Sequence, residues 1–555
     1  MIILHISFKE GNMKLKRTVS VLLAGLLIVG CGSGGEGESG DAGNSVVVTI
    51  ESDLNTMDHH VATDGTSFIM QSMCIGGLAA LDSEGQPIYD LAENWEVSED
   101  GTVYTFYIRD GVNWSNGTPL TAHDFVYGWR RLNDPELASE YAFILETIGV
   151  KNAAAAHKGE VPLEDMGVEA VDDKTFVVTL DQPCGFLLSL MSFPSFFPLN
   201  QEFFEAHEAT YAQSIDDLLY CGPYTFTKWE ENTEYTFTKN PEYWDAANCT
   251  DDMDEVVFRF VSESQSAALA YQQGDIDAVK LSGDLVDQYK DDPGFTQRLE
   301  GFAWRVSINQ QQESGIFDNL NFRKALTLSI DRDVIANDVL KDGSVAAVGF
   351  IPMQFAFGPD GTDYRDTAGD LLTFDVEAAQ AALEEAKKEL GVDNFSITLL
   401  YETDSEAPGK VAINLQSMWK ENLGIEVTLL PKTKKERLQL MNNLDYDLGL
   451  TRWGPDYADP QTYLDLYKSD ISGYNGAYFN DEFNALMNKA ETGEDSTDLE
   501  KRWADMVEAE KMLLDDVAMI PVFQMGSAML INPNITGIEF HSAGVDSYRH
   551  IKRVD

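Results

Sequence analysis

The fold class is decided by residues 396–430, which read SITLLYETDSEAPGKVAINLQSMWKENLGIEVTLL. Ser396–Tyr401 predicts a buried strand, Lys410–Asn422 a helix, and Ile425–Leu430 a second strand. Gly424 follows the last helical turn, where a glycine supplies the left-handed conformation that ends a helix. A right-handed crossover places two such strands in parallel in one sheet. The stretch therefore predicts an α/β fold.

A second strand–helix–strand unit lies earlier in the chain. It comprises Val256–Val261, a helix near Gln265–Gln273 that Gly274 ends, and Ile276–Val279. Between residues 90 and 200 the sequence is instead rich in predicted strands. Two α/β centres with a strand-rich segment before them predict two lobes and an inserted β-containing part, because no low-complexity linker divides the chain after residue 45.

The composition is strongly acidic. The chain has 555 residues, with 39 Lys and Arg against 93 Asp and Glu, which gives a formal net charge of −54. Hydrophobic residues make up 44% and aromatic residues 11%, which is enough for a large buried core. So many carboxylates repel phosphate backbones, so we exclude nucleic acid as a partner. The charge could also attract cations or basic peptides, but we interpret it first as a feature of solubility or of a salty habitat.

The N-terminus has the pattern of an export signal. Lys14, Lys16 and Arg17 precede the apolar run Val19–Val29. A basic segment followed by 11 apolar residues is typical of a secretory signal, and it is shorter than the roughly 20 residues that span a bilayer. We therefore expect residues 1–30 to be a signal peptide.

The end of this run, Ile28-Val29-Gly30-Cys31, resembles the bacterial lipobox, whose cysteine carries a diacylglyceryl group. An ordinary signal peptide with an incidental cysteine is the alternative. Residues 31–45 are rich in Gly and Ser, which is typical of a flexible tether. The sequence thus predicts a body anchored to a membrane by a lipid on Cys31.

The remaining cysteines do not indicate a disulfide scaffold or a zinc site, because their spacings of 110, 37 and 28 residues match no such motif. We expect buried free thiols, with one or two bridges after export as the alternative. These cysteines are Cys74, Cys184, Cys221 and Cys249.

Catalytic and phosphate-binding motifs are missing. His207-Glu208 lacks the second histidine of a zinc-protease helix, and Val411 follows Gly409-Lys410 where a phosphate-binding loop needs Ser or Thr. We find no Gly-x-Ser-x-Gly elbow. The prediction is a protein that is not an enzyme and that uses no metal or other cofactor.

Several motifs, in order along the chain, give the sequence its resemblance to a known family. The densest is Leu91-Ala-Glu-Asn-Trp-Glu-Val-Ser-Glu-Asp-Gly101, continued by residues 109–129, RDGVNWSNGTPLTAHDFVYGW. This set resembles the oligopeptide-binding proteins of ABC importers, a class of solute-binding proteins that also holds dipeptide and nickel binders. The resemblance covers essentially all of residues 46–555. Further matches are Gly222-Pro-Tyr224, Asn240–Asp245, Tyr271–Asp277, Phe322–Leu326, Trp419–Ile425 and Ile520-Pro-Val522.

The resemblance implies an α/β, two-lobed fold like that of periplasmic binding proteins, with a hinged cleft and an extra inserted β-rich domain. The expected boundaries place 83–219 in the inserted domain and 309–524 in lobe II. Lobe I is expected to combine 46–82, 220–308 and 525–555.

By the same resemblance, residues 453–460, WGPDYADP, line the ligand. Asp456 is matched to the aspartate that pairs with a peptide's N-terminal ammonium; the alternative is that it only caps a turn before Pro460. The backbones of Arg452 and Gly454 are expected to pair with an extended peptide, as an added strand does. Trp453 and Tyr457 belong to the same predicted contact.

Other predicted ligand residues come from distant parts of the chain. Thr63 and Gly65 are matched to the opposite side of the clamp, in a loop where His59 replaces a proline of relatives. Asn309 and Phe523 are placed near the crossovers between the lobes, and core packing is an equal alternative for Phe523. Some peptide binders have an arginine for the ligand's C-terminal carboxylate where this chain has Met441 and Leu450, so no peptide length is predicted.

Together these observations predict a monomeric, lipid-anchored receptor that captures oligopeptides outside the cytoplasm and passes them to the permease subunits of an ABC transporter. A two-membrane cell would hold it in the periplasm. A dipeptide, a nickel chelate, a sugar or a signalling peptide is the alternative ligand. An envelope chaperone or adhesin and an extracellular hydrolase are the alternatives from other classes.

Overall fold

The computed structural model describes residues 45–50, 52–249, 254–469 and 476–554. The predicted signal peptide, Cys31 and residues 31–44 of the predicted tether lie outside this part of the chain. In the described part, no helix has the length and apolar character needed to cross a membrane.

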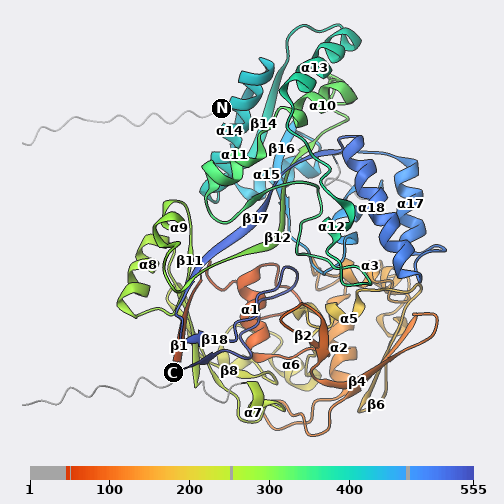
Figure 1. The fold of residues 1–555 in the computed structure, drawn as a ribbon. Helices are drawn as coiled ribbons and strands as arrows, with labels where there is room; N and C mark the ends of the chain where they lie inside the picture. The colour runs from red at the N-terminus through yellow and green to blue at the C-terminus, as the bar shows by residue number, and fades with distance from the viewer. Residues whose placement is uncertain (1–44, 51, 250–253, 470–475, 555) are drawn as a thin grey trace, which may run out of the picture. The chain divides into compact units, whose positions relative to one another are not determined.

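The largest sheet of the described chain has eleven strands (Figure 1). The stretch that predicted the fold class lies at one of its edges, where β14 and β15 pair in parallel from Ser396↔Glu426 to Glu402↔Lys432. The predicted parallel pair is therefore confirmed. In sheet order the strands are β15 (Glu426–Lys432), β14 (Ser396–Glu402), β16 (Leu448–Trp453), β12 (Phe295–Ile308), β17 (Met519–Ile531), β11 (Ala278–Leu281), β1 (Ser45–Ile50), β10 (Glu255–Phe260), β9 (Glu234–Lys239) and β8 (Tyr224–Glu230), with β13 (Val345–Ala346) beside β17.

The helix between β14 and β15 is longer than the sequence predicted. α14 spans Glu406–Leu423, so that Pro408 lies in its first turn. A proline is tolerated there because the first N–H groups of a helix have no intrahelical acceptor. Gly424 ends the helix at φ 70°, as its position predicted.

The second predicted unit also lies in this sheet. α8 (Ser264–Gln273) connects β10 to β11, and Gly274 ends the helix at φ 81°. β10 and β11 do not pair with each other, because β1 lies between them and pairs in parallel with both. The predicted parallel arrangement is confirmed, with the N-terminal strand inserted in the middle.

Two long antiparallel strands, β12 and β17, join the two halves of the sheet (Figure 1). Residues 295–299 of β12 pair with 526–530 of β17, close to where β17 also pairs with β11. Residues Ala303–Ile308 pair with β16 on the opposite edge of β12. Register shifts interrupt the pair between Leu299 and Ala303 and again between Trp304 and Arg305. Such bulges bend and twist a strand. The two lobes are thus connected by two irregular strands, and the expected boundaries at 308 and 524 remain predictions.

The inserted segment has its own antiparallel sheet, in the order β4 (Ala92–Val97), β5 (Val103–Ile108), β7 (Thr175–Thr179), β6 (Val168–Asp172). α2 (Ala122–Leu132) packs on it and buries Trp129 completely. The indole N–H of Trp129 donates to the carbonyl of Phe196 at 3.1 Å. The α/β fold with two lobes and an inserted β-rich domain, expected from the sequence, is confirmed.

Helices cover both faces of the sheet in lobe II. α10 (Leu320–Leu328), α13 (Val376–Leu390) and α14 pack on the face that carries Val306 and Ile308. α16 (Gln461–Leu464), α17 (Asp481–Glu491) and α18 (Leu499–Asp515) pack on the face that carries Ala303. Because successive side chains of a strand alternate between faces, neighbouring residues of β12 enter different cores.

The other elements are short or peripheral. They are α1 (Gly65–Cys74), β2 (Ala79–Leu81), β3 (Pro87–Tyr89), α3 (Phe143–Thr147), α4 (Ala153–His157), α5 (Leu187–Leu190), α6 (Gln201–His207), α7 (Ala246–Cys249), α9 (Asp284–Tyr289), α11 (Arg332–Val334), α12 (Tyr364–Ala368), α15 (Lys434–Asn442), β18 (Ile535–Thr536) and β19 (Lys552–Arg553). Short helical turns are η1 (Leu163–Asp165), η2 (Pro194–Phe196), η3 (Ile215–Asp217), η4 (Ile335–Leu340) and η5 (Asp465–Tyr467).

Cys74, Cys184 and Cys221 are buried free thiols, as expected, whereas the side chain of Cys249 lies outside the description.

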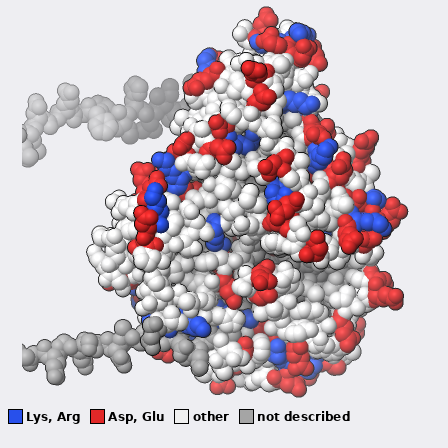
Figure 2. Space-filling model, in the orientation of Figure 1, with Lys and Arg blue, Asp and Glu red and all other residues white. Residues whose placement is uncertain are grey.

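Acidic side chains are spread over the face seen in Figure 2, with Lys and Arg scattered among them. On this face the acidic groups are thus not gathered into one patch.

Candidate ligand-binding site

The segment that the sequence singled out, residues 453–460, connects the end of β16 to α16. The indole N–H of Trp453 donates to the hydroxyl of Thr462 at 3.1 Å. At Gly454 the ring of Phe302 approaches so closely that a Cβ atom would overlap it. A larger residue here would displace the ring of Phe302, a packing constraint that the sequence motif alone did not reveal.

Asp456 is half-buried at the contact between this segment and the inserted domain. The hydroxyl of Tyr141 donates to its carboxylate at 3.4 Å. Within the described residues, no Lys, Arg or His forms an ion pair with Asp456. Burial raises the pKa of Asp456 to about 7, because the ionised form loses hydration and gains no cation in return.

The turn after Asp456 is held by a different aspartate. Asp459 accepts a hydrogen bond from the backbone N–H of Gln461 at 2.9 Å and forms a buried ion pair with Arg502 at 2.7 Å. In the described part of the chain, no backbone N–H donates to the carboxylate of Asp456. The described contacts of Asp456 therefore show no cap of the turn before Pro460, the alternative role for this residue.

Tyr457 attaches the segment to the inserted domain. Its ring stacks on Phe186, with centroids 3.8 Å apart and planes 3° from parallel, and only 5% of the residue is exposed. The stacked pair buries the apolar faces of both rings, which favours this contact. Asp456 and Tyr457 are thus adjacent residues of lobe II that both contact the inserted domain.

Arg452 on β16 and Phe523 on β17 lie opposite Trp304 of β12, one on each side of that strand. The guanidinium of Arg452 lies 4.8 Å from the ring centroid of Phe302 and 5.7 Å from that of Trp304. Phe523 is 3% exposed and stacks on Trp304 at 5.6 Å. The contacts of Phe523 are therefore those of a core residue, which was the alternative to a ligand contact. Arg452 has no carboxylate partner among the described residues.

The other predicted ligand residues have different surroundings. Thr63 and Gly65 are exposed at the start of α1, where Asp64 accepts a hydrogen bond from the N–H of Ser67. No hydrogen bond in the described chain joins either residue to residues 453–457. The amide of Asn309 donates to the carbonyls of Leu444 and Tyr446 at 2.8 and 2.9 Å. Both amide hydrogens of Asn309 are donated to backbone carbonyls, so none is free to donate to a ligand.

Sequence reasoning missed four residues that surround the segment. Each is far from it in the chain and lies in no motif, so only the packing reveals them. They are Tyr141, Phe186, Phe302 and Arg502.

Two cavities lie near these elements. One of about 460 Å³ is lined by the inserted domain at Gly185–Ser189, by 354–359, by Ala458 and Asp459, and by 540–543. Its volume falls within the range of small-ligand pockets. It borders residues 453–460 and contains groups from both lobes.

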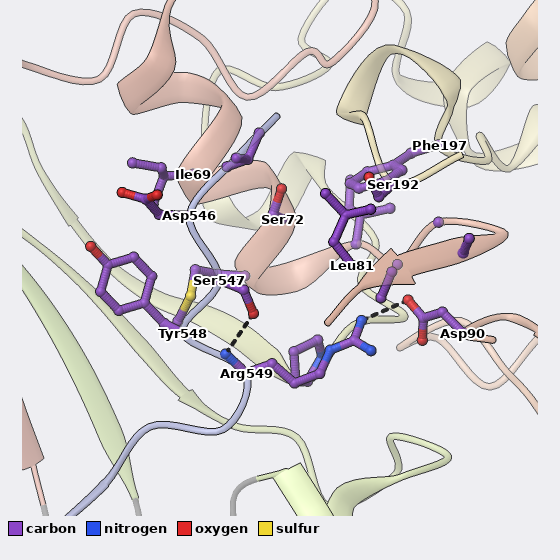
Figure 3. A pocket seen from close by; sticks show the side chains of 18 of the residues that line it. Ile69, Ser72, Leu81, Asp90, Ser192, Phe197, Asp546, Ser547, Tyr548 and Arg549 are labelled. Atoms are coloured by element: carbon purple, nitrogen blue, oxygen red, sulfur yellow. Dashed lines mark hydrogen bonds and ion pairs between the residues drawn. The ribbon is translucent and has the colours of Figure 1, made fainter. Parts of the chain in front are cut away.

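The other cavity lies beside α1 and residues 545–549 (Figure 3). Asp90 at its edge pairs with Arg549 at 2.7 Å and accepts hydrogen bonds from Tyr243 and Trp244 at 2.6 and 2.9 Å. Its volume is about 60 Å³, room for a few water molecules. It is too small for a peptide, and its charges are already paired.

Two lobes that share a sheet through β12 and β17, with an acidic site where lobe II meets the inserted domain, are the architecture of a two-lobed solute-binding protein. The chain belongs to the bacterial extracellular solute-binding proteins of family 5, whose family model matches residues 86–475. The family expected from the sequence is confirmed. Its members are solute-binding proteins rather than enzymes, and they work outside the cytoplasm.

Individual proteins show the same relationship over nearly the whole chain. The oligopeptide-binding protein OppA of Bacillus subtilis is 30% identical over 533 residues, 94% of this chain and 95% of that protein. A dipeptide-binding protein of Lactococcus lactis is also 30% identical, over 95% of this chain and 96% of that protein. The structure of Listeria monocytogenes OppA bound to peptide superposes with a TM-score of 0.77 at 33% identity, covering 93% of this chain and all of that chain.

Proposed function

We propose that this protein captures oligopeptides in the cleft between its lobes and delivers them to the permease subunits of an ABC transporter. Membership of family 5 supports the transport role, and the names of the OppA relatives support the peptide. The ligand stabilises the closed form by its higher affinity for that form, and closure presents an altered surface to the permease. Among the described residues no group of three or more His, Cys, Asp or Glu could hold a metal ion.

The observation that carries the proposal is Asp456. It is a carboxylate without a cation among the described residues, at the contact between lobe II and the inserted domain. A peptide's N-terminal ammonium supplies the missing positive charge, and a charge-assisted hydrogen bond offsets the cost of burying both groups. A sugar has no ammonium and would leave the carboxylate unpaired.

A buried strand edge that no other described strand pairs with supports the same ligand. β14 pairs with β16 only at Leu448 and Gly449, so the edge from Leu450 to Arg452 has no strand partner in the described chain. An extended peptide can add to such an edge through main-chain hydrogen bonds, which depend little on the peptide's side chains. Residues 450–452 lead directly to Asp456, so one peptide can engage the edge and place its N-terminus at the carboxylate.

The cellular setting completes the proposal. We infer that the signal peptide 1–30 exports the chain, that Cys31 carries the lipid, and that residues 31–45 connect the lipid to the body. The protein would then act as a monomer on the outer face of the cytoplasmic membrane, or in the periplasm of a two-membrane cell.

The test is to incubate the unliganded domain with a pool of peptides of two to ten residues and to measure retained peptides by native mass spectrometry. We expect retention of peptides with a free N-terminus, and loss of retention after N-acetylation or in Asp456→Ala. Asp291→Ala, which removes an exposed carboxylate without a described partner, is the matched control and should bind as the wild type does. A folded, empty protein that retains no peptide would contradict the proposal and favour a different solute.

A further inference from the structure

His541 lies in a loop after β18, near the C-terminus, and only 9% of the residue is exposed. Its Nδ1 lies 2.8 Å from the carbonyl oxygen of Val545, and its Nε2 lies 2.9 Å from the carbonyl oxygen of Asp82. A carbonyl oxygen can only accept a hydrogen bond, so both ring nitrogens must donate to satisfy their neighbours. A neutral imidazole has one N–H, whereas the imidazolium has two. The geometry at His541 is therefore that of the protonated ring.

No other histidine of the described chain has a carbonyl oxygen hydrogen-bonded at both ring nitrogens. His157 and His207 each place one ring nitrogen near a carbonyl oxygen, at 3.0 and 2.9 Å, which a neutral ring satisfies. The remaining described histidines also lack the double contact; they are His59, His60, His123 and His550. Protonation is thus built into the contacts of His541 alone.

The ring of His541 fastens a loop to a turn. We call residues 539–547 the C-terminal loop; backbone hydrogen bonds of 2.9 and 2.8 Å join its two ends. Inside the loop, Asp546 accepts the backbone N–H of His541 at 3.0 Å and pairs with Arg298 of β12 at 2.9 Å. The contact of Nε2 with Asp82 leaves the loop and reaches the turn between β2 and β3. One side chain therefore both shapes the C-terminal loop and ties it to another element.

The C-terminal loop also contacts lobe II. The hydroxyl of Ser542 donates to the carbonyl of Gln354 at 2.8 Å. Ala543 is 8% exposed and packs in the core that α16, α17 and α18 cover. At Gly301 of β12, a Cβ atom would overlap both the carbonyl oxygen of Ser542 and the ring of Pro455, which belongs to the candidate site segment. The loop thus reaches lobe II beside that segment.

Two cavities flank the imidazole of His541. It lines the cavity of about 460 Å³ that borders residues 453–460, and it lines the cavity of about 60 Å³ shown in Figure 3. The wall of the larger cavity includes Phe357, which is 47% exposed, so this cavity opens to solvent. A proton can therefore reach the ring without unfolding of the loop.

The charged groups that surround His541 come from its own loop, from β12, from the turn after β2 and from the walls of the two cavities. The carboxylates are Asp82, Glu84, Asp90, Glu300, Asp459, Glu539 and Asp546. The groups that carry or can carry positive charge are Arg298, Arg502, Arg549 and His550, and each pairs with one of these carboxylates. Carboxylates outnumber cations, so a positive ring has counter-charge nearby.

We propose that His541 is a proton-operated latch between the turn after β2, the C-terminal loop and lobe II. As an imidazolium it donates to Val545 and Asp82 and holds the loop in contact with lobe II. When the ring loses its proton, one nitrogen presents a lone pair to a carbonyl oxygen less than 3 Å away, so one of the two contacts breaks. The loop then separates from the turn, and the contact of Ser542 with Gln354 weakens with it. The latch does not depend on which solute occupies the cleft.

The first experiment measures the protonation of the ring in the whole protein. Histidine labelled with ¹⁵N reports the state of each ring nitrogen by NMR, and His541→Phe identifies the signal. At pH 5.5 both nitrogens of His541 should carry a proton, and both protons should exchange slowly with water because both are hydrogen-bonded. At pH 9 one nitrogen should have lost its proton. A ring of His541 that is neutral at pH 5.5 would overturn the inference.

The second experiment measures the latch by hydrogen exchange with mass spectrometry, in residues 82–86, 352–356 and 539–547. After correction for the intrinsic pH dependence of exchange, protection in these segments should fall about 10- to 100-fold between pH 5.5 and 9, the range for hydrogen bonds to charged groups. His541→Phe should show the low protection at both pH values. His207→Phe, which removes a ring with a single carbonyl contact, is the matched control and should behave as the wild type does. Constant protection in wild type, or the same fall in His541→Phe, would contradict the latch.

Discussion

The ionisation of Asp456 makes peptide affinity depend on pH in a defined way. In the empty protein, burial raises the pKa of this carboxyl to about 7, well above its ordinary value. A bound ammonium favours the ionised form, so ligand binding must remove the proton from molecules that still carry it. The affinity should therefore rise as the pH increases toward 7.

The magnitude follows from the fraction of ionised protein. At pH 7 about half of the empty molecules carry an ionised Asp456, and at pH 5 about one in a hundred do. The Kd should thus be about 50-fold weaker at pH 5 than at pH 7. Above pH 7 the gain is at most about twofold, and the peptide's own α-amino group begins to lose its proton near pH 8. Burial raises the pKa of the neighbouring Tyr457 and Tyr463 well above 10, so neither titrates in this range.

Isothermal titration calorimetry between pH 5 and 8 measures this dependence, and buffers with different ionisation enthalpies count the protons. About half a proton should be released per peptide bound at pH 7. Asp456→Asn and N-acetylated peptides should show weak binding without the slope, whereas Asp291→Asn should reproduce the wild type. A wild-type Kd that is constant from pH 5 to 7, or an Asp456→Asn variant that keeps the slope, would refute the reasoning.

Three other predictions concern His59 in the loop before α1 and two residues of or beside the segment 453–460. Burial lowers the pKa of His59 to about 4, so its contribution to stability is lost as the pH falls from 6.5 to 4, by up to about 3 kcal/mol; burial also lowers the pKa of His60, so urea unfolding of His59→Phe should show a smaller loss and His59→Phe/His60→Phe should lack it. Gly454→Ala should destabilise the protein by about 1–3 kcal/mol, seen as a lower Tm, because the new Cβ overlaps the ring of Phe302. Arg502→Met leaves Asp459 buried without its cation and should cost about 3–5 kcal/mol in urea unfolding, and adding Asp459→Asn should recover much of the loss.

Local features of the chain were predictable from the sequence. The parallel pair β14 and β15 and the glycine that ends α14 follow from short-range periodicity and capping. The family also followed from motifs that recur in order. The insertion of β1 between β10 and β11 did not, because strand order depends on pairing between residues more than 200 positions apart.

The candidate site was likewise predictable only in part from the sequence. Its central segment and Asp456 were identified from the sequence by resemblance. The residues that define its chemistry were not: Tyr141 and Phe186 come from the inserted domain. Asn309 was predicted beside the ligand, but its amide is used by two backbone carbonyls. Nothing in the local sequence distinguishes an asparagine that serves a turn from one that faces a cleft.

By itself the sequence determined the fold class, the family, the acidic surface and the segment that contains the candidate site, because these depend on residue type, spacing and order. Only the tertiary structure decided which charges are paired. Arg305, Arg332 and Arg502 are the same residue type, yet one has free Nη atoms, one is capped by carbonyls and one is neutralised by Asp459. The energy of a buried charge depends on its hydration and on its neighbours in space, and folding sets both.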